Sequence, residues 1–334
     1  MVEPYYQPDM LTDPTVSVIV PNYNHARFLS KRLGSIFNQT YQDFEVILLD
    51  DCSTDNSVEI LRSYAGHPRV SHCVVNDQNS GSPFKQWEKG IALARGEYIW
   101  IAESDDWAET DFLEKLLPQF IANIGLVYCR SLVVDENDEA FRGDFFWPEG
   151  LDAQKWRSDY AADGLQEIAE CLVYRNTIPA ASACIMNRSF MRAFPDIQSF
   201  KYAGDWLFWI ELLKNCRLHY SALPMNKHRW HVSTSRGLET RQNEKVRLRE
   251  YFRVILRAKT IAHIRDTRSE NYLWIFKEIY WHRRVFFTAL LWPPMLFSLR
   301  PAYYRYIVAK LSKKVFNTVR AALRFAKKPV GSGR

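Results

Sequence analysis

The sequence predicts an α/β fold built on a doubly wound, mostly parallel sheet, and three observations lead to this prediction. Short runs of β-branched and other apolar residues recur along the first third of the chain. Each run is followed by a segment whose apolar residues have helical spacing. Polar or acidic residues stand where the runs stop. Strands and helices that alternate in this way form βα units with parallel strands.

Four strand–helix pairs are expected in this part of the chain. The strands are expected at Val16–Val20, Phe44–Leu49, Val70–Val75 and Tyr98–Ala102. The helices are expected over Phe28–Phe37, around Ile60 and Leu61, and over Pro83–Ala94 and Phe112–Ile121. Pro21 ends the first strand and Gly96 follows the third helix, which is typical punctuation of such elements.

The pattern is less regular after the fourth helix. Strands are expected at Ile124–Arg130 and Leu132–Asp135, and Asn176–Arg188 is a mixed, strand-like run. Phe141–Leu151 is irregular and aromatic, and a further helix begins near Asp205. We expect a lead-in at residues 1–15 and one domain at 16–236, with halves 16–130 and 131–236. A helical extension follows at 237–334.

Composition narrows the class of protein. The chain has 334 residues, of which 47% are hydrophobic, enough for a sizeable core. Its six cysteines are scattered without a CxxC pair, and no signal-peptide pattern is present, so we expect reduced thiols and a cytoplasmic location. Neither GxGxxG nor GxxxxGK[ST] occurs, which argues against a dinucleotide fingerprint or a P-loop.

The net charge of +6 conceals an asymmetry. From Ile279 to Arg334 there are 12 Lys and Arg and no Asp or Glu, while the remainder has 32 basic and 38 acidic residues. Val285–Leu299 is apolar but too short to span a bilayer comfortably. Tyr304–Ala326 has the pattern of a basic amphipathic helix, which favours peripheral attachment to an anionic membrane on its inner face. Packing on the protein's own acidic body is the alternative. Nucleic acid is not expected, because no groove-reading motif accompanies the charge.

Acidic residues cluster where two of the strands end. Glu103, Asp105 and Asp106 follow the fourth strand, and Asp50 and Asp51 end the second. The carboxyl ends of parallel strands meet at one edge of a sheet, where α/β proteins bind ligands. Carboxylates this close raise each other's pKa unless a cation lies between them. Mg²⁺ or Mn²⁺, shared with a diphosphate, would fit. The alternative is a solvated acidic turn before a helix.

The loop after the first strand fits a nucleotide. Tyr23 would suit a base, and Asp51 at the neighbouring strand end would suit the imide or ribose hydroxyls. A half-buried loop aromatic with no ligand is the alternative for Tyr23.

Three segments carry a resemblance to a known family. They are VSVIVPNYNHARFLSKRLGSIFNQTYQDFEVILLDDCSTDNS, NSGSPFKQWEKGIALARGEYIWIAESDDW and the later YAGDWLFWIELL. Over roughly Val16 to Ser235 the chain resembles the family 2 glycosyltransferases of the GT-A fold, of the kind found in bacterial surface polysaccharide and O-antigen biosynthesis. The resemblance implies a Rossmann-like nucleotide half and an acceptor half.

The resemblance also implies roles for particular residues. The nucleotide sugar would be bound by Pro21, Asn22, Tyr23, Asp50, Asp51, Lys85, Glu103, Ser104, Asp105 and Arg229, with Asp55 supporting. Glu103-Ser104-Asp105 takes the place of the family's metal-binding DxD motif, with Glu as the departure. The metal ligands would be Asp105, Asp106 and His231, the catalytic base Asp205 and the acceptor contact Trp206. Ordinary alternatives remain for Lys85 (a solvated helix lysine), Asp205 (a helix-dipole residue) and His231 (a structural histidine).

The activity implied is an inverting, metal-dependent transfer. A sugar would move from a UDP-, dTDP- or GDP-sugar to a glycan or lipid-linked glycan, with one carboxylate taking the acceptor hydroxyl's proton. Mg²⁺ or Mn²⁺ would stabilise the leaving diphosphate. A non-catalytic module that binds nucleotide sugars or glycans on the same fold is the alternative.

Overall fold

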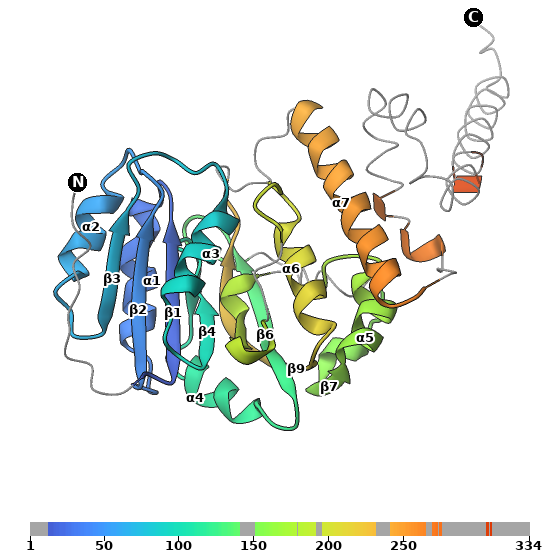
Figure 1. The fold of residues 1–334 in the computed structure, drawn as a ribbon, viewed down its shortest axis with the longest axis horizontal. Helices are drawn as coiled ribbons and strands as arrows, with labels where there is room; N and C mark the ends of the chain where they lie inside the picture. The colour runs from blue at the N-terminus through green and yellow to red at the C-terminus, as the bar shows by residue number, and fades with distance from the viewer. Residues whose placement is uncertain are drawn as a thin grey trace, which may run out of the picture. The chain divides into compact units, whose positions relative to one another are not determined.

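In a computed structural model of the chain, nine strands of the described residues form one mixed sheet (Figure 1). In chain order they are β1 (Val16–Asn22), β2 (Phe44–Asp50), β3 (Val70–Val75), β4 (Tyr98–Ile101), β5 (Trp107–Ala108), β6 (Ile124–Val134), β7 (Tyr160–Asp163), β8 (Cys184–Asn187) and β9 (Arg217–Arg229). The order across the sheet is β3-β2-β1-β4-β8-β6-β9-β5, and β7 pairs with β9.

The structure describes residues 13–140, 151–178, 180–191, 196–231, 241–264, 269–272, 274–275, 305–306 and 308. The chain divides into two compact units, residues 1–264 and 265–334. The described helices of the first unit are α1 (Ala26–Phe37), α2 (Ser57–Tyr64), α3 (Pro83–Leu93), α4 (Phe112–Leu116), α5 (Gly164–Glu167), α6 (Gly204–Leu213) and α7 (Arg241–Ile261). Short helical turns lie at Leu117–Gln119, Lys155–Arg157, Ile168–Leu172, Ala181–Ala183, Arg188–Phe190 and Ser269–Tyr272.

The first half is the predicted doubly wound arrangement. β1 pairs in parallel with β2 and with β4, and β2 pairs in parallel with β3. Side chains alternate between the two faces of a strand. Val18 and its neighbours on one face pack with apolar side chains of α1, α2 and α4. Ile19 points to the other face, where it contacts α3 so closely that a Cβ on Gly90 would lie 2.3 Å from it.

The second half joins the first through an antiparallel strand. β8 lies between β4 and β6 and is antiparallel to both, while β6 and β9 are parallel. The two strands predicted at Ile124–Arg130 and Leu132–Asp135 form the single strand β6, because an irregularity in its pairing with β9 between Cys129 and Ser131 lets the strand continue.

Two other predicted elements are shorter than expected. The helix over Phe112–Ile121 is α4 plus the short turn after Leu116, since Pro118 has no backbone N–H to continue it. Of the strand-like run Asn176–Arg188, only β8 is a strand.

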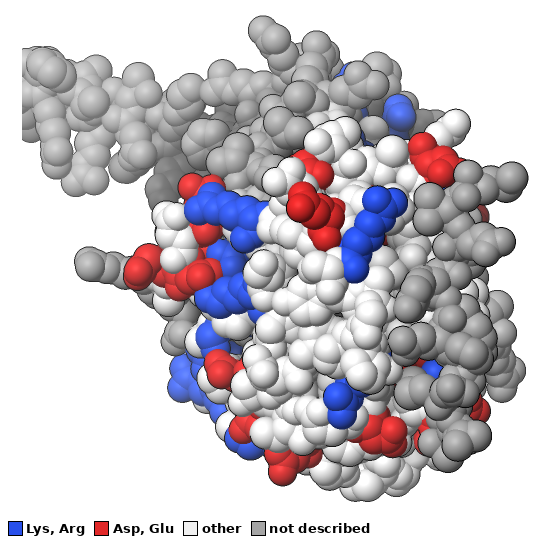
Figure 2. Space-filling model, turned by 90° about the vertical axis from the view of Figure 1, so that its left-hand side faces the viewer, with Lys and Arg blue, Asp and Glu red and all other residues white. Residues whose placement is uncertain are grey.

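Several predictions lie outside the described residues. These are most of the lead-in at 1–15, nearly all of the irregular span 141–151, and all but three residues of the basic segment 279–334. Within the residues that are described, no helix is both long and apolar enough to cross a membrane. Figure 2 shows one face of the protein, on which Lys and Arg side chains stand beside Asp and Glu around a largely uncharged middle.

Candidate active site at the carboxyl ends of the strands

The loops after β1 and β2 are held together by side-chain hydrogen bonds. Asp50, fully buried, accepts hydrogen bonds from the Asn22 amide (2.7 Å) and from the Ser53 hydroxyl (2.7 Å) and backbone N–H (2.8 Å). Asn24, in the left-handed region at φ 55°, accepts from the backbone N–H of Thr54 at 2.7 Å. Asn22 and Asp50, two of the predicted nucleotide residues, therefore fix the shape of this rim.

Asp51 is also engaged by its own chain. Its carboxylate accepts from Asn76 (2.7 Å), Gln86 (2.8 Å), and the backbone N–H (2.9 Å) and hydroxyl (2.8 Å) of Ser80. Three of these donors meet Oδ1, and only the Ser80 hydroxyl meets Oδ2. A nucleoside hydroxyl or imide could therefore donate to Oδ2, which has a second lone pair, without replacing one of them. Tyr23, by contrast, is 45% exposed beside this rim.

The loop after β4 carries the acidic cluster. The Glu103 carboxylate accepts from the indole N–H of Trp87 at 2.8 Å, and its backbone N–H donates to Ser182 at 3.1 Å. Burial and the nearby charge of Asp105 raise the pKa of Glu103 to about 8, although the Trp87 hydrogen bond opposes the shift. Glu103 is therefore held in place by Trp87 of α3. With a pKa of about 8, its carboxyl group is largely protonated at neutral pH in the absence of a cation.

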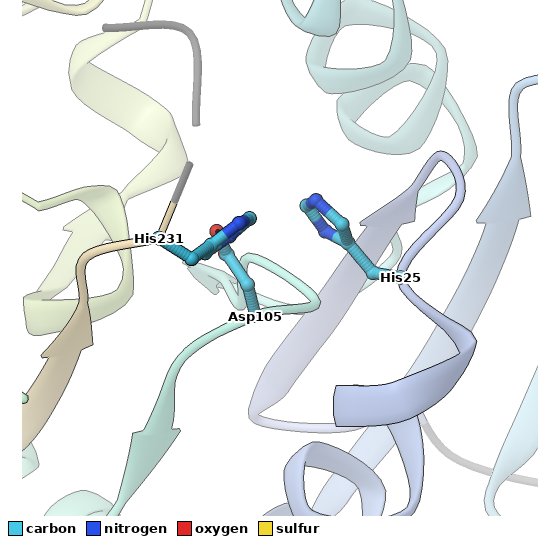
Figure 3. Close-up of side chains that lie close together, drawn as sticks. All are labelled: His25, Asp105 and His231. Atoms are coloured by element: carbon cyan, nitrogen blue, oxygen red, sulfur yellow. Dashed lines mark hydrogen bonds and ion pairs between the residues drawn. The ribbon is translucent and has the colours of Figure 1, made fainter. Parts of the chain in front are cut away.

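Two histidines meet Asp105 at this edge (Figure 3). The His231 Nε2 lies 3.1 Å from Asp105 Oδ2, and the His25 ring stands edge-on to the His231 ring with 5.4 Å between centroids. His25 Nδ1 lies 2.8 Å from the hydroxyl of Ser104. Burial opposes ionisation of Asp105, but the His231 hydrogen bond and the positive charge of the surrounding histidines hold its pKa below the usual value.

His25, Asp105 and His231 could hold a metal ion. One ligand atom from each lies within 4.8 Å of the others. Two nitrogen ligands on opposite sides of one ion are at most about 4.2 Å apart, so a small inward movement of a side chain would complete the site. Imidazole and carboxylate together suit Mn²⁺ and other transition metals, and a carboxylate also suits Mg²⁺.

His25 was not among the predicted site residues. It comes from the loop after β1, immediately before α1, and its place just past a strand end was the signal that could have identified it. Asp106 and Arg229, in contrast, do not take the predicted positions. Asp106 is buried and turns toward β9, where its carboxylate accepts from the backbone N–H of Arg229 at 2.9 Å, so it is not part of the three-residue metal group.

Arg229 is buried and its guanidinium is fully engaged. It donates to the backbone oxygens of Asp105 (2.8 Å) and Asp135 (2.9 Å) and pairs with the Asp138 carboxylate at 2.6 Å. In this structure Arg229 holds the acidic loop, and the predicted contact with phosphate would require it to leave one of these partners. Lys85 is exposed and donates to the Ser80 backbone oxygen at 2.9 Å.

Arg32 is a second buried cation near the site. Arg32 belongs to α1 and its side chain is fully buried, with the guanidinium 4.8 Å from the Trp100 ring. None of its three side-chain nitrogens has a hydrogen-bond acceptor among the described residues. Burial lowers the pKa of Arg32 to about 10, against the attraction of Asp106, Glu103 and Asp105. Arg32 thus supplies positive charge near the acidic loop, and no local pattern in the sequence indicated this role.

The predicted base and acceptor residue lie at the start of α6. Asp205 accepts a hydrogen bond from the side-chain amide of Asn176 at 2.8 Å, which orients the carboxylate. Trp206 is only 1% exposed and donates its indole N–H to the Leu172 backbone oxygen at 2.8 Å. The ring of Trp206 is buried in this structure, so the predicted acceptor contact would require it to become exposed. The helix turns this residue inward, about 100° around the helix axis from Asp205.

Comparison with known proteins gives the following likenesses. Residues 17–177 match the family model described as Glycosyl transferase family 2. Chondroitin synthase of Escherichia coli is 34% identical over 138 residues, which are 40% of this chain and 20% of that protein. The match spans less than half of the length of each of the first curated relatives.

Two solved structures are similar in fold. The crystal structure of S. aureus TarS in complex with UDP-GlcNAc has a TM-score of 0.56 at 18% identity, over 80% of this chain and 72% of that one. The mannosyltransferase PcManGT from Pyrobaculum calidifontis, in complex with GDP-Man and Mn²⁺, has a TM-score of 0.50 at 18% identity, over 93% of this chain and 90% of that one.

Proposed function

Residues 17–177 are a family 2 glycosyltransferase domain, the sheet has the GT-A fold, and on that premise we propose that the protein transfers a sugar from a nucleotide-sugar donor to a glycan or lipid-linked glycan. The observation that carries the proposal is the meeting of His25, Asp105 and His231 at the carboxyl end of β4. Relatives such as chondroitin synthase support a place in polysaccharide biosynthesis.

His25, Asp105 and His231 would hold Mg²⁺ or Mn²⁺. A bound divalent ion neutralises the charge that develops on a leaving diphosphate. The Mn²⁺ and GDP-Man in the mannosyltransferase structure support a metal and a nucleotide sugar as ligands of this fold. Pro21, Asn22, Asp50 and Asp51 shape the rim for the nucleoside. Tyr23 contacts the base, and the exposed Lys85 and the Glu103–Ser104 segment line the donor side.

Asp205 acts as the general base. The carboxylate takes the proton of the acceptor hydroxyl while that oxygen attacks the anomeric carbon from the face opposite the diphosphate. One displacement of this kind inverts the anomeric configuration. The hydrogen bond from Asn176 orients the Asp205 carboxylate.

Replacing the proposed base distinguishes a transferase from a non-catalytic module that only binds nucleotide sugars. Asp205→Asn keeps the shape of the side chain and removes its basicity, so transfer should fall about 10²–10⁴-fold while donor affinity is unchanged. Calorimetry with UDP-, dTDP- and GDP-sugars in Mn²⁺ or EDTA measures binding, and product NMR reports both turnover and anomeric configuration. A non-catalytic module would bind a donor equally in both proteins and turn it over in neither. Retained configuration would refute the single displacement.

The membrane part of the proposal concerns the basic segment 279–334. With 12 positive and no negative side chains it would bind the anionic inner face of the cell membrane, near a lipid-linked acceptor. Protein cut after Arg300 should keep metal-dependent donor binding and no longer sediment with anionic vesicles at low salt. If the full-length chain does not sediment with such vesicles either, the segment has another role.

A further inference from the structure

The segment before α6 is held by a carboxylate from a distant part of the chain. Glu250, in the middle of α7, is 3% exposed. It accepts hydrogen bonds from three successive backbone N–H groups, those of Lys201 (2.8 Å), Tyr202 (2.7 Å) and Ala203 (3.0 Å). Ala203 immediately precedes α6, and Asp205 is the second residue of that helix.

Neighbouring residues of α7 reinforce this contact. The Tyr251 ring meets the Trp206 indole in a T-shaped arrangement with centroids 5.8 Å apart, and the Arg253 guanidinium lies 4.3 Å from the Phe200 ring. On the other side, the Phe84 ring of α3 is so close to Gly204 that a Cβ there would lie 2.4 Å from it. The first turn of α6 is therefore fixed from both sides.

The backbone N–H groups of Lys201, Tyr202 and Ala203 require an acceptor from outside α6, and Glu250 provides it. They lie just before a helix, where backbone donors have no partner inside the helix itself. A buried carboxylate that meets three of them forms charge-assisted hydrogen bonds, which are stronger and more directional than neutral ones. The side-chain hydrogen bond of Asn176 fixes the Asp205 carboxylate, whereas Glu250 fixes the backbone that carries it.

We propose that Glu250 is a positioning residue for the catalytic base. Helix α7, which carries Glu250, would then contribute to catalysis by fixing the backbone that precedes Asp205. This inference rests on the proposed function, because it takes Asp205 as the base. Misplacement of a reacting group by about 1 Å costs up to about 100-fold in rate. Glu250 should therefore act on turnover and leave donor binding unchanged, because the donor site lies on other elements.

The test uses full-length protein and three variants. Glu250→Gln keeps the size of the side chain and removes its charge, and Glu250→Ala removes the acceptor altogether. Arg257→Met is the control, because Arg257 pairs with Glu211 between the same two helices but does not touch residues 201–203. We expect kcat to fall about 10-fold in Glu250→Gln and about 100-fold in Glu250→Ala, with donor Kd in Mn²⁺ unchanged. Arg257→Met should stay within about twofold of wild type.

Amide hydrogen exchange gives a readout that does not depend on activity. The amides of 201–203 should exchange about tenfold faster in Glu250→Gln and at the wild-type rate in Arg257→Met. Unchanged exchange in Glu250→Gln overturns the inference, and so does normal kcat despite faster exchange. Loss of donor binding in parallel with kcat would also overturn it, since that pattern indicates general unfolding. If wild-type protein binds no nucleotide sugar, the proposed function fails instead.

Discussion

The two edges of the parallel strands β1–β4 each hold a glutamate, and the two glutamates meet different numbers of donors. Glu45, at the amino edge, accepts from the Ser17 hydroxyl (2.7 Å), the Arg95 backbone N–H (2.8 Å) and the Arg95 guanidinium (3.0 and 3.1 Å). At the carboxyl edge, Glu103 accepts from Trp87 alone among the described residues.

The pKa values of the two groups shift in opposite directions. Burial opposes ionisation of Glu45, but the hydrogen bonds from Ser17 and Arg95 outweigh it and lower its pKa. Burial and the charge of Asp105 raise the pKa of Glu103 to about 8. The Glu45 carboxylate at the amino edge is thus stabilised in its ionised form by its own chain, whereas the Glu103 carboxylate at the carboxyl edge is not. Such an imbalance marks the edge that binds a ligand.

Removing a metal ligand should produce the largest effect. Asp105→Ala deletes the one carboxylate in the three-residue metal group and should weaken Mn²⁺-dependent donor binding more than about 100-fold, beyond the effect usual for a supporting residue. His25→Ala should cost about tenfold, since two ligands remain. Calorimetry with and without EDTA measures both. Donor affinity that is insensitive to EDTA in all three proteins would show that the carboxyl edge binds no metal.

The amino edge should respond in stability rather than in binding. Glu45→Gln removes the charge from a carboxylate that holds Arg95, so the free energy of unfolding should fall by about 2 kcal/mol at pH 7, with metal affinity unchanged. The pKa of Glu45 is lowered by folding, so its contribution is present above its unfolded pKa near 4.5 and is lost as the pH falls through the folded value. Denaturant titrations between pH 3 and 7 should therefore show that the free energies of unfolding of wild type and Glu45→Gln become equal at the acid end of this range. A difference that persists at low pH would contradict this account.

The smallest effect is expected for Glu103→Gln, which should raise the free energy of unfolding where Glu45→Gln lowers it. The pKa of Glu103 is raised by folding, so its contribution is fully present below about 4.5 and is lost as the pH rises toward about 8. Without metal, the variant should gain stability relative to wild type over that range, by about 1 kcal/mol at pH 7 after allowance for solvent screening. Metal-free thermal unfolding from pH 5 to 9 measures it. A loss of stability at high pH would mean that both edges are structural.

Much of the fold followed from local patterns. Mainly apolar runs such as Val16–Val20 and Phe44–Leu49 became buried strands, and their polar members Ser17 and Glu45 hydrogen-bond to each other. The acidic residues after β4 lie at the strand end because the run stops there. Strand order, the antiparallel β8 and the union of two predicted strands in β6 depend on partners distant in sequence, which no local pattern specifies.

The sequence by itself therefore determined where the chain turns from strand to loop, and with that which carboxylates stand at the ligand-binding edge. Tertiary structure decided which side chains face the site. It brought His25 to Asp105 and His231, turned Arg229 and Trp206 into the core, and placed Glu250 under the backbone before Asp205. The physical reason is that a polar side chain buried on folding takes whichever partner the packing places within hydrogen-bond distance, and that partner is usually far away along the chain.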